Sequence, residues 1–340
     1  MNILKITRSN FNTFITGMQK YGEVHVPKKK SEISYIYDKM NSPDEIAFEF
    51  LRTITPVKKY FMKPVEKLLK YSADSGFNVE MEDPDKKIII FGLHPCDINS
   101  IKILDLALSG KFVDPYYFNK RKNTIIFGLG CMPDDKCFCR SMGTDHVTDG
   151  FDLYFVDLNK YFLVNVGSSI GDDFTKEFSD LFERPESKDI DDYIEKRNIR
   201  AKSFKLSLDV SDLPYIMDIE RESEIWDELG KKCLCCGSCS MVCPTCYCFN
   251  VYDRVDLEGN SGERFRQWDT CLAKDYTLVA GGHVFRKKRS DRVKNRYYHK
   301  QHGFVEEYGR PSCTGCGRCI QYCPTKIHVV DVLNKVMGKL

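Results

Sequence analysis

The first half of the chain alternates short apolar runs with helical patterns, which is typical of an α/β domain. Lys86–Leu93 and Asn123–Leu129 are almost continuously apolar, as expected for strands buried in a parallel sheet. Ile98–Leu108, between them, has helical spacing. Together the three segments predict a βαβ unit with a right-handed crossover. Ile3–Ile6 predicts a further strand, followed by a helix that Ser9 or Asn10 caps.

Two other segments complete the predicted N-terminal domain. Phe151–Val156 and Tyr161–Val166 are short apolar runs separated by turn residues, so they predict a β-hairpin. Arg52–Phe61 is interpreted as a loop that leads into an amphipathic helix.

A change in composition predicts the domain boundary. Residues 183–200 are highly charged, helical in pattern and poor in apolar residues. With residues 202–214 they form the predicted linker. We therefore expect an α/β domain with a partly parallel sheet over residues 1–215, and a second domain over residues 216–340.

Composition narrows the possible functions. The chain has 340 residues and a formal net charge of +2, so bulk charge favours neither nucleic acid nor an anionic membrane as a partner. It contains no apolar run of transmembrane length. Met1–Lys5 lacks the features of a signal peptide. Sixteen cysteines in a chain that is not exported indicate thiolate metal ligands in a reducing compartment, so we expect a cytoplasmic protein.

The second domain contains the pattern C-x2-C-x2-C-x3-C-P twice. The first copy comprises Cys233, Cys236, Cys239 and Cys243, and the second comprises Cys313, Cys316, Cys319 and Cys323. This is the ligand pattern of bacterial-type [4Fe–4S] clusters, in which the fourth cysteine of each motif binds the other cluster. We therefore predict that Cys233, Cys236, Cys239 and Cys323 hold one cluster, and that Cys313, Cys316, Cys319 and Cys243 hold the second.

The motif loops contain three glycines, and the spacing of their cysteines also bears on the choice between an iron–sulfur cluster and zinc. Gly237, Gly315 and Gly317 would allow close approach of the backbone and unusual dihedral angles. Zinc also binds pairs of C-x2-C, but it does not require the third cysteine step or the C-x3-C-P ending. The long insert between the motifs predicts an α-helical ferredoxin domain with two clusters, not the compact β-containing kind.

Four cysteines of the N-terminal domain predict a third iron–sulfur site. Cys96 and Cys131 each follow a predicted parallel strand, so they are expected at the same edge of the sheet, where ligands collect. Cys137 and Cys139 follow a few residues later. The four thiols could bind a third [4Fe–4S] cluster or zinc, or they could be structural cysteines. Four further cysteines, interpreted as structural or as neighbours of a cluster, remain: Cys235, Cys246, Cys248 and Cys271.

A basic and aromatic segment, Arg286–Lys300, lies between the motifs. It could be a solvated helix face, a docking surface for an acidic redox partner or, least in agreement with the net charge, a nucleic-acid site. Its cations would also favour the reduced, more anionic state of nearby clusters and so raise their potentials.

Several segments resemble one known family, the beta subunits of cytoplasmic sulfhydrogenase-type [NiFe] hydrogenases, and more distantly the A subunit of anaerobic sulfite reductase. The segments are Arg52–Pro64, Phe91–Asp97, Cys131–Asp134, Cys137–Cys139, Cys243–Cys248, Trp268–Cys271 and Ala280–Arg286. The resemblance extends along nearly the whole chain.

The resemblance implies an electron-transfer subunit without a substrate or catalytic residues of its own. It implies an FAD-containing, NAD(P)H-linked flavoprotein partner of the ferredoxin-reductase type, and a terminal partner that is a hydrogenase, a sulfite reductase or a heterodisulfide-reductase-type module. It also supports the third cluster. Two other classes remain as alternatives: an enzyme that reduces a small substrate at the N-terminal cysteines, and a zinc-stabilised nucleic-acid-binding protein.

Overall fold

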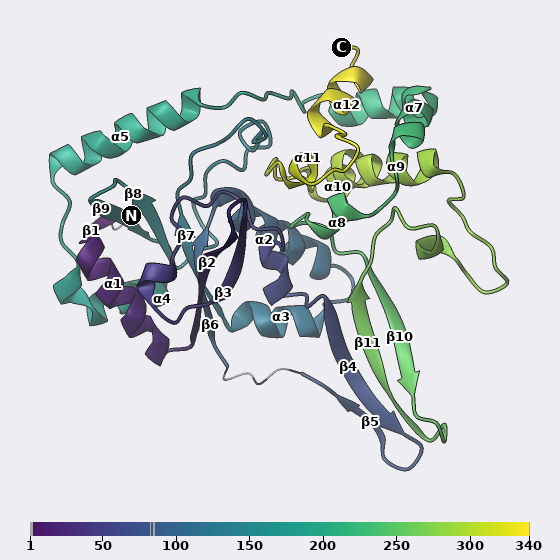
Figure 1. The fold of residues 1–340 in the computed structure, drawn as a ribbon, viewed down its shortest axis with the longest axis horizontal. Helices are drawn as coiled ribbons and strands as arrows, with labels where there is room; N and C mark the ends of the chain where they lie inside the picture. The colour runs from purple at the N-terminus through teal and green to yellow at the C-terminus, as the bar shows by residue number, and fades with distance from the viewer. Residues whose placement is uncertain (1–2, 82, 84–85, 340) are drawn as a thin grey trace.

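A seven-stranded mixed sheet forms the N-terminal half of this computed structural model, which describes residues 3–81, 83 and 86–339. The strand order is β1-β9-β8-β7-β6-β2-β3, and β2, β6, β7 and β8 are mutually parallel (Figure 1). The strands are β1 (Ile3–Thr7), β2 (Glu23–Ser31), β3 (Ser34–Lys39), β6 (Ile88–Leu93), β7 (Thr124–Leu129), β8 (Leu153–Asp157) and β9 (Tyr161–Val166).

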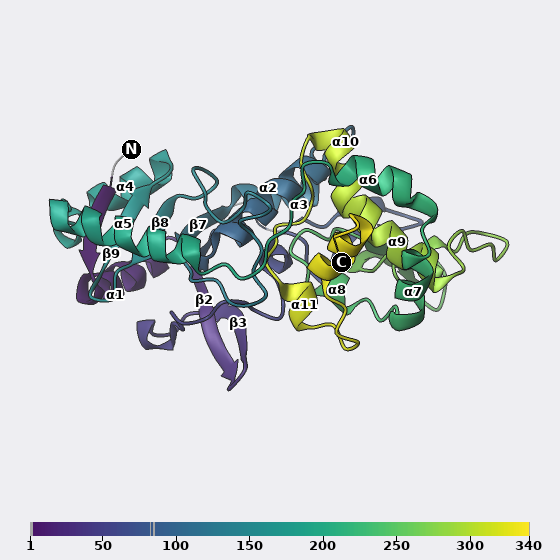
Figure 2. The ribbon, with the colours of Figure 1, turned by 90° about the horizontal axis from the view of Figure 1, so that it is seen from above.

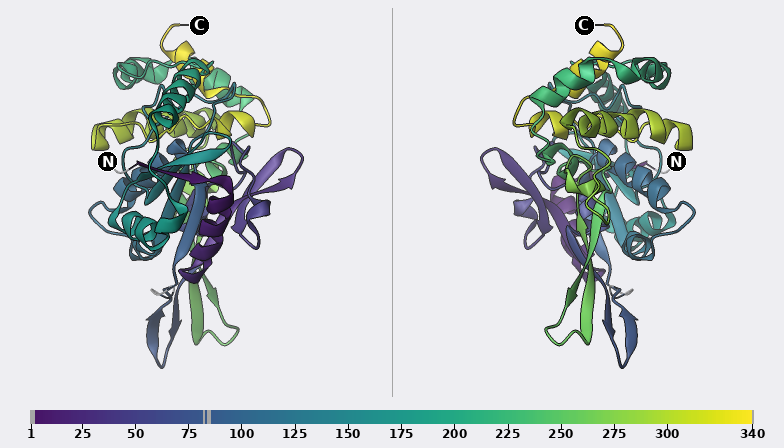
Figure 3. Two further views of the ribbon diagram at one scale, coloured as in Figure 1. Left: turned by 90° about the vertical axis from the view of Figure 1, so that its left-hand side faces the viewer. Right: turned by 90° about the vertical axis from the view of Figure 1, so that its right-hand side faces the viewer.

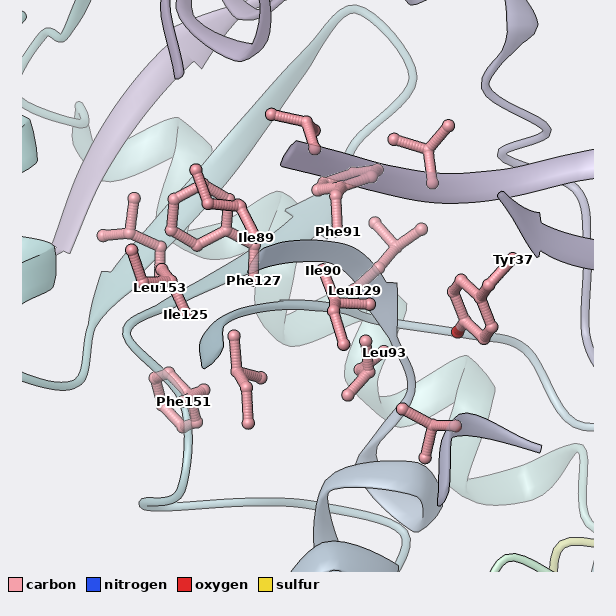
Figure 4. Packing of buried hydrophobic residues seen from close by; sticks show 14 of the residues in the cluster. Tyr37, Ile89, Ile90, Phe91, Leu93, Ile125, Phe127, Leu129, Phe151 and Leu153 are labelled. Atoms are coloured by element: carbon pink, nitrogen blue, oxygen red, sulfur yellow. The ribbon is translucent and has the colours of Figure 1, made fainter. Parts of the chain in front are cut away.

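Helices cover both faces of this sheet. On one face, Phe11 and Phe14 of α1 (Arg8–Gly17) pack against aromatic residues of β6, β7, β8 and β9. On the other face lies α2 (Pro95–Leu108), since Ile98 packs beneath Gly128 of β7. Figure 4 shows the buried side chains of β6 and β7, which form the centre of this core. The remaining α-helices of this half, among the described residues, are α3 (Pro115–Lys122), α4 (Ser169–Glu177) and α5 (Ser187–Lys202).

The regular elements predicted for this half are largely present. The predicted βαβ unit corresponds to β6, α2 and β7, whose strands are parallel, and the predicted hairpin corresponds to β8 and β9. The first helix is capped by Thr7 instead of Ser9 or Asn10, because the Thr7 hydroxyl accepts a hydrogen bond from the amide of Asn10.

A second, four-stranded antiparallel sheet was not predicted. It has the order β10-β11-β4-β5 and projects from the rest of the molecule in both views of Figure 3. Its strands are β4 (Val65–Ser72), β5 (Gly76–Val79), β10 (Phe249–Val255) and β11 (Ser261–Trp268). A short 3-10 helix, Val57–Tyr60, followed by β4 replaces the expected amphipathic helix, so that prediction was wrong.

This sheet also changes the description of the second domain. The hairpin β10–β11 lies between the two cysteine motifs, so a purely α-helical ferredoxin domain is not confirmed. The ladder between β4 and β11 crosses the predicted boundary at residue 215, which stays a prediction.

Buried charges join this sheet to α3. The Glu66 carboxylate of β4 forms ion pairs with Lys120 of α3 and, at 2.6 Å, with Arg266 of β11. Arg266 also pairs with Asp114, which caps α3. Glu66, Lys120 and Arg266 are each less than 10% exposed. Water therefore cannot replace a lost partner in this network.

We expect Glu66→Ala to lower the free energy of unfolding by about 3–5 kcal/mol, because it leaves two buried cations without their shared carboxylate. The matched control is Glu263→Ala, which removes the partner of Lys67 in a half-exposed pair, at 2.6 Å, between the same two strands. That change should cost about 1 kcal/mol or less. Urea unfolding followed by circular dichroism measures both values. Equal losses in the two variants would contradict the role given to Glu66.

The C-terminal half, apart from its hairpin, consists of short helices around a second apolar core. They lie at one end of the seven-stranded sheet (Figure 2). They are α6 (Leu213–Ile219), α7 (Ile225–Lys232), α8 (Ser238–Met241), α9 (Arg289–Tyr298), a π-helix (His299–Gly303), α10 (Phe304–Tyr308), α11 (Arg318–Gln321) and α12 (Val329–Val336). Among the described residues, none of the helices combines the length and apolar character needed to cross a bilayer.

Candidate iron–sulfur centre

The first predicted cysteine quartet surrounds one cavity. Three of its members belong to the first motif, on the loop after α7 and on the short helix α8. The fourth, Cys323, comes from the second motif, just after α11. The lining of this cavity includes all four, Cys233, Cys236, Cys239 and Cys323, together with Cys319 of the second motif. The structure therefore brings together the set that the exchange of fourth cysteines predicts.

The second quartet surrounds an adjacent cavity in the same way. Its lining includes Cys243, Cys313, Cys316 and Cys319. Arg296, Tyr297 and Val329 line both cavities, as does Cys319 of the second quartet, so the two quartets adjoin each other here. In the described part of the chain, no group of three or more His, Cys, Asp or Glu side chains is arranged to hold a single metal ion. Four thiols around a cavity are the donor set that a polynuclear [4Fe–4S] cluster requires.

Glycines allow the motif loops to adopt this form. Gly237 and Gly317 have φ values of 78° and 74° at the starts of α8 and α11, a region that favours glycine. Gly315 is also a point of close approach, since a Cβ atom there would lie 2.6 Å from the backbone of Cys139. Gly315 also has a positive φ, 61°, so the unusual dihedral angles predicted for these three glycines are confirmed.

Two buried cations of the basic segment face the quartets. Arg296 is 7% exposed and lies between the cavities, and Lys300 is 4% exposed and lines the second. Burial lowers the pKa of Arg296, but the thiolates of Cys239 and Cys319 raise it by more, so the group stays charged. Its Nε atom has no hydrogen-bond partner among the described residues. A buried and incompletely paired guanidinium fits a site that receives an anionic cluster.

The four N-terminal cysteines also gather at one place. Cys96 lies in the first turn of α2, and Cys131 follows β7. The Cys139 thiol interacts electrostatically with those of Cys96, Cys131 and Cys137. Burial raises the pKa of Cys137 to about 12, although Arg52 opposes the shift. Thiols buried in this way bind metal or remain protonated and inert.

Arg52 connects this N-terminal group to the second quartet. Its Nη2 atom donates a hydrogen bond to the Cys137 sulfur at 3.1 Å, and its Nε atom donates one to the Cys316 carbonyl at 2.6 Å. Asp134 accepts from the same guanidinium and fixes its orientation. Nearby, the Phe138 amide donates to the Gly315 carbonyl at 2.9 Å. The cysteine loops of the two halves are therefore in direct contact.

Sequence reasoning did not find the positions of the remaining cysteines or of the buried lysines. Cys246 interacts directly with Cys243, and Cys248 with Cys271. The amino group of Lys58 donates to the Cys246 carbonyl at 2.8 Å and lies 4.1 Å from the ring centre of Trp268. The spacing of these cysteines follows no ligand motif, so only the fold brings them together.

Comparison with known proteins agrees with this geometry. A family model described as a 4Fe-4S dicluster domain matches residues 232–327. The sulfhydrogenase 2 subunit beta of Pyrococcus furiosus is 40% identical over 336 residues, which cover 99% of this chain and 98% of the relative. The chain belongs to the sulfhydrogenase beta-subunit family. The resemblance inferred from the sequence motifs is thus confirmed. No solved structure matches this beta-subunit homologue significantly.

Proposed function

We propose that this chain is the iron–sulfur electron-transfer subunit of a hydrogenase complex. The observation that carries the proposal is the pair of adjacent cavities, whose linings each include three cysteines of one motif and the fourth of the other, with Cys319 lining both. The match to a 4Fe-4S dicluster domain and the similarity to a sulfhydrogenase subunit support it. A bound [4Fe–4S] cluster supplies one-electron redox chemistry, so two neighbouring clusters can pass single electrons.

The protein's own residues would hold the clusters, keep water away and adjust the local charge. Tyr297 and Val329, both at most 5% exposed, separate the cavities with apolar surface. Arg296 adds a positive charge that both sites share. A cation at this position favours the more negative, reduced state of either cluster. The cations expected to raise the cluster potentials are therefore those on the buried face of the basic segment, Arg286–Lys300.

A third cluster at Cys96, Cys131, Cys137 and Cys139 is part of the proposal. Its support is the contact of one guanidinium, that of Arg52, with both Cys137 and the Cys316 loop. This contact gives the order N-terminal site, second quartet, first quartet. Electrons entering at one end of the row could leave at the other end.

The proposed partners follow from the family. One is a flavoprotein that exchanges electrons with NAD(P)H, and the other is a hydrogenase catalytic module. A sulfite reductase or a heterodisulfide-reductase-type module could occupy the terminal position in a related complex. In all of these assemblies the chain transports electrons, and the terminal chemistry takes place in another subunit.

Anaerobic purification followed by iron, sulfide and zinc analysis tests the proposal. We expect a brown protein with about eight iron atoms per chain from the two C-terminal clusters, or about twelve if the N-terminal site is also filled. Reduction should produce paramagnetic signals from interacting clusters. A colourless protein with zinc, or one with about four iron atoms or fewer, would contradict the proposal.

A further inference from the structure

Two of the cysteines outside the quartets, Cys248 and Cys271, are held together by the base of the β10–β11 hairpin. Phe249 pairs with Trp268 at the end of the ladder. The next pair continues this register, since the Asp269 amide donates to the Cys248 carbonyl at 3.0 Å. The chain then turns, so Cys271 lies next to Cys248. The strands thus bring the two cysteines to one place although 23 positions separate them.

The two thiols are in direct contact. A side-chain hydrogen bond joins Cys248 to Cys271, and the Tyr276 hydroxyl also bonds to the Cys248 sulfur. Cys243 makes a similar contact with Cys246, which lies outside the quartets. Cys239 and Cys319 interact with the other members of their quartets electrostatically and face a shared cavity. Touching sulfurs suit a sulfur–sulfur bond, whereas cluster ligands must stand apart around the metal.

The surroundings favour a reactive thiolate at Cys248. The hydrogen bond from Cys271 lowers the pKa of Cys248 to about 6, although burial acts in the opposite direction and Tyr276 adds to the lowering. The pKa of Cys271 is raised, because it keeps the proton that it donates. One thiolate beside one thiol is the state from which dithiols react.

The pair is also connected to the second quartet. Cys246, two residues before Cys248, has its thiol in contact with that of Cys243, which lines the second cavity. Lys58 acts electrostatically on Cys243, Cys246 and Cys248, and it donates to the Cys246 carbonyl. Lys58 therefore connects the quartet cysteine Cys243 to Cys248 electrostatically.

We propose that Cys248 and Cys271 form a redox-active dithiol that exchanges electrons with the two C-terminal [4Fe–4S] clusters. The proposal rests on the proposed function, because those clusters are the electron acceptors and donors. In the oxidation, the S–H bond of Cys271 breaks, an Sγ–Sγ bond forms with the Cys248 thiolate, and one proton and two electrons leave. With both clusters bound and oxidised, one of these electrons would pass to each. The reverse step would take one electron from each reduced cluster and one proton from solvent.

Such a pair would store two electrons beside carriers that hold one each. A flavin or a nicotinamide exchanges two electrons at a time, whereas a [4Fe–4S] cluster exchanges one. A dithiol next to the clusters would let the subunit hold a complete two-electron equivalent when a partner is not ready to accept it.

The experiment uses the full chain, purified without oxygen, as wild type and as Cys248→Ser and Cys271→Ser variants. Cys235→Ser is the matched control, because Cys235 is a further cysteine outside the quartets and lies in the first motif loop. Each sample is oxidised with a mild dye, titrated with dithionite and analysed for iron. In parallel, peptide mapping after alkylation measures the Cys248–Cys271 disulfide in wild type at a series of potentials.

We expect wild type and Cys235→Ser to take up about two electrons per chain more than either pair variant, with the same iron content in all four. The mapped disulfide should appear and disappear reversibly in wild type, a result that does not depend on the variants folding. Equal electron uptake without a mapped disulfide would overturn the proposal, and the pair would be inert. A loss of iron in Cys248→Ser or Cys271→Ser would also overturn it, and the pair would be cluster ligands. Wild type without clusters would refute the proposed function instead, and dithiothreitol titration of the mapped disulfide would still test the pair.

Discussion

Cys316→Ser should remove the second cluster and interrupt electron flow while the N-terminal core remains folded. Cys316 lines the second cavity, and a serine hydroxyl is a much poorer ligand than a thiolate. We expect iron to fall by about four atoms per chain. Electron transfer between the flavoprotein and the hydrogenase should fall by about 100-fold or more, since the second site lies between the other two. The main apolar core, built around the seven-stranded sheet, does not include this loop.

Three measurements test this prediction together. Iron analysis measures whether the second cluster is present. NAD(P)H-linked hydrogen turnover of the reconstituted complex measures electron transfer, and far-ultraviolet circular dichroism shows whether the chain is folded. Cys235→Ser again serves as the control, because it makes the same chemical change one residue before a ligand and should preserve iron and turnover. Unchanged turnover in Cys316→Ser, with the cluster lost, would show that electrons do not pass through this site.

The sequence predicted the elements whose residues obey a single strong pattern. The continuous apolar runs of β6 and β7 are typical of buried strands, and the spacing of both cysteine motifs can be read directly from the sequence. The exchange of Cys243 and Cys323 between cavities also follows from the motif, since a tight loop can present only three thiols to one cluster.

The second sheet could not be predicted from local pattern. Val65, Leu68 and Leu69 of β4 have spacing that suits a helix as well as a strand, and β10 has exposed apolar residues on a largely solvated surface. What decides the conformation is the pairing of β4 with β11, nearly 200 residues away, and the ion pairs of Glu66. Tertiary contacts of this range override local preference.

Long-range contacts also explain which features of the site could not be predicted from the sequence. Nothing near Arg52 in the sequence indicates that its guanidinium contacts both Cys137 and the Cys316 carbonyl. The basic segment was ambiguous because α9 has two faces. Its buried face includes Arg292 and Arg296, whereas Arg289 and Lys294 are on the outer side. Only the packing of α9 against α7 separates these roles.

Cys139→Ser should distinguish a third cluster from a buried group of structural thiols. Cys139 is 4% exposed, and its thiol interacts with those of Cys131 and Cys137. Serine is nearly the same size, so the backbone contact of Cys139 with Gly315 should persist. If the four thiols hold a cluster, iron should fall from about twelve to about eight atoms per chain. If they are structural, iron should not change.

The effect of Cys139→Ser on turnover then shows whether the third cluster lies on the path of electron transfer. A cluster at the N-terminal site would lie beyond the second quartet, beside the carboxyl ends of β6 and β7. If a partner docks there, Cys139→Ser should stop the flow as completely as Cys316→Ser does. Iron loss with normal turnover would instead mean that both partners exchange electrons with the C-terminal pair of clusters.

Because Arg52 contacts both sites, the variant Arg52→Lys adds a test. It keeps the charge but loses the planar guanidinium that reaches Cys137 and Cys316 together. A lower turnover with full iron in that variant would show that the contact between the two loops, and not the ligands alone, sets the rate of transfer.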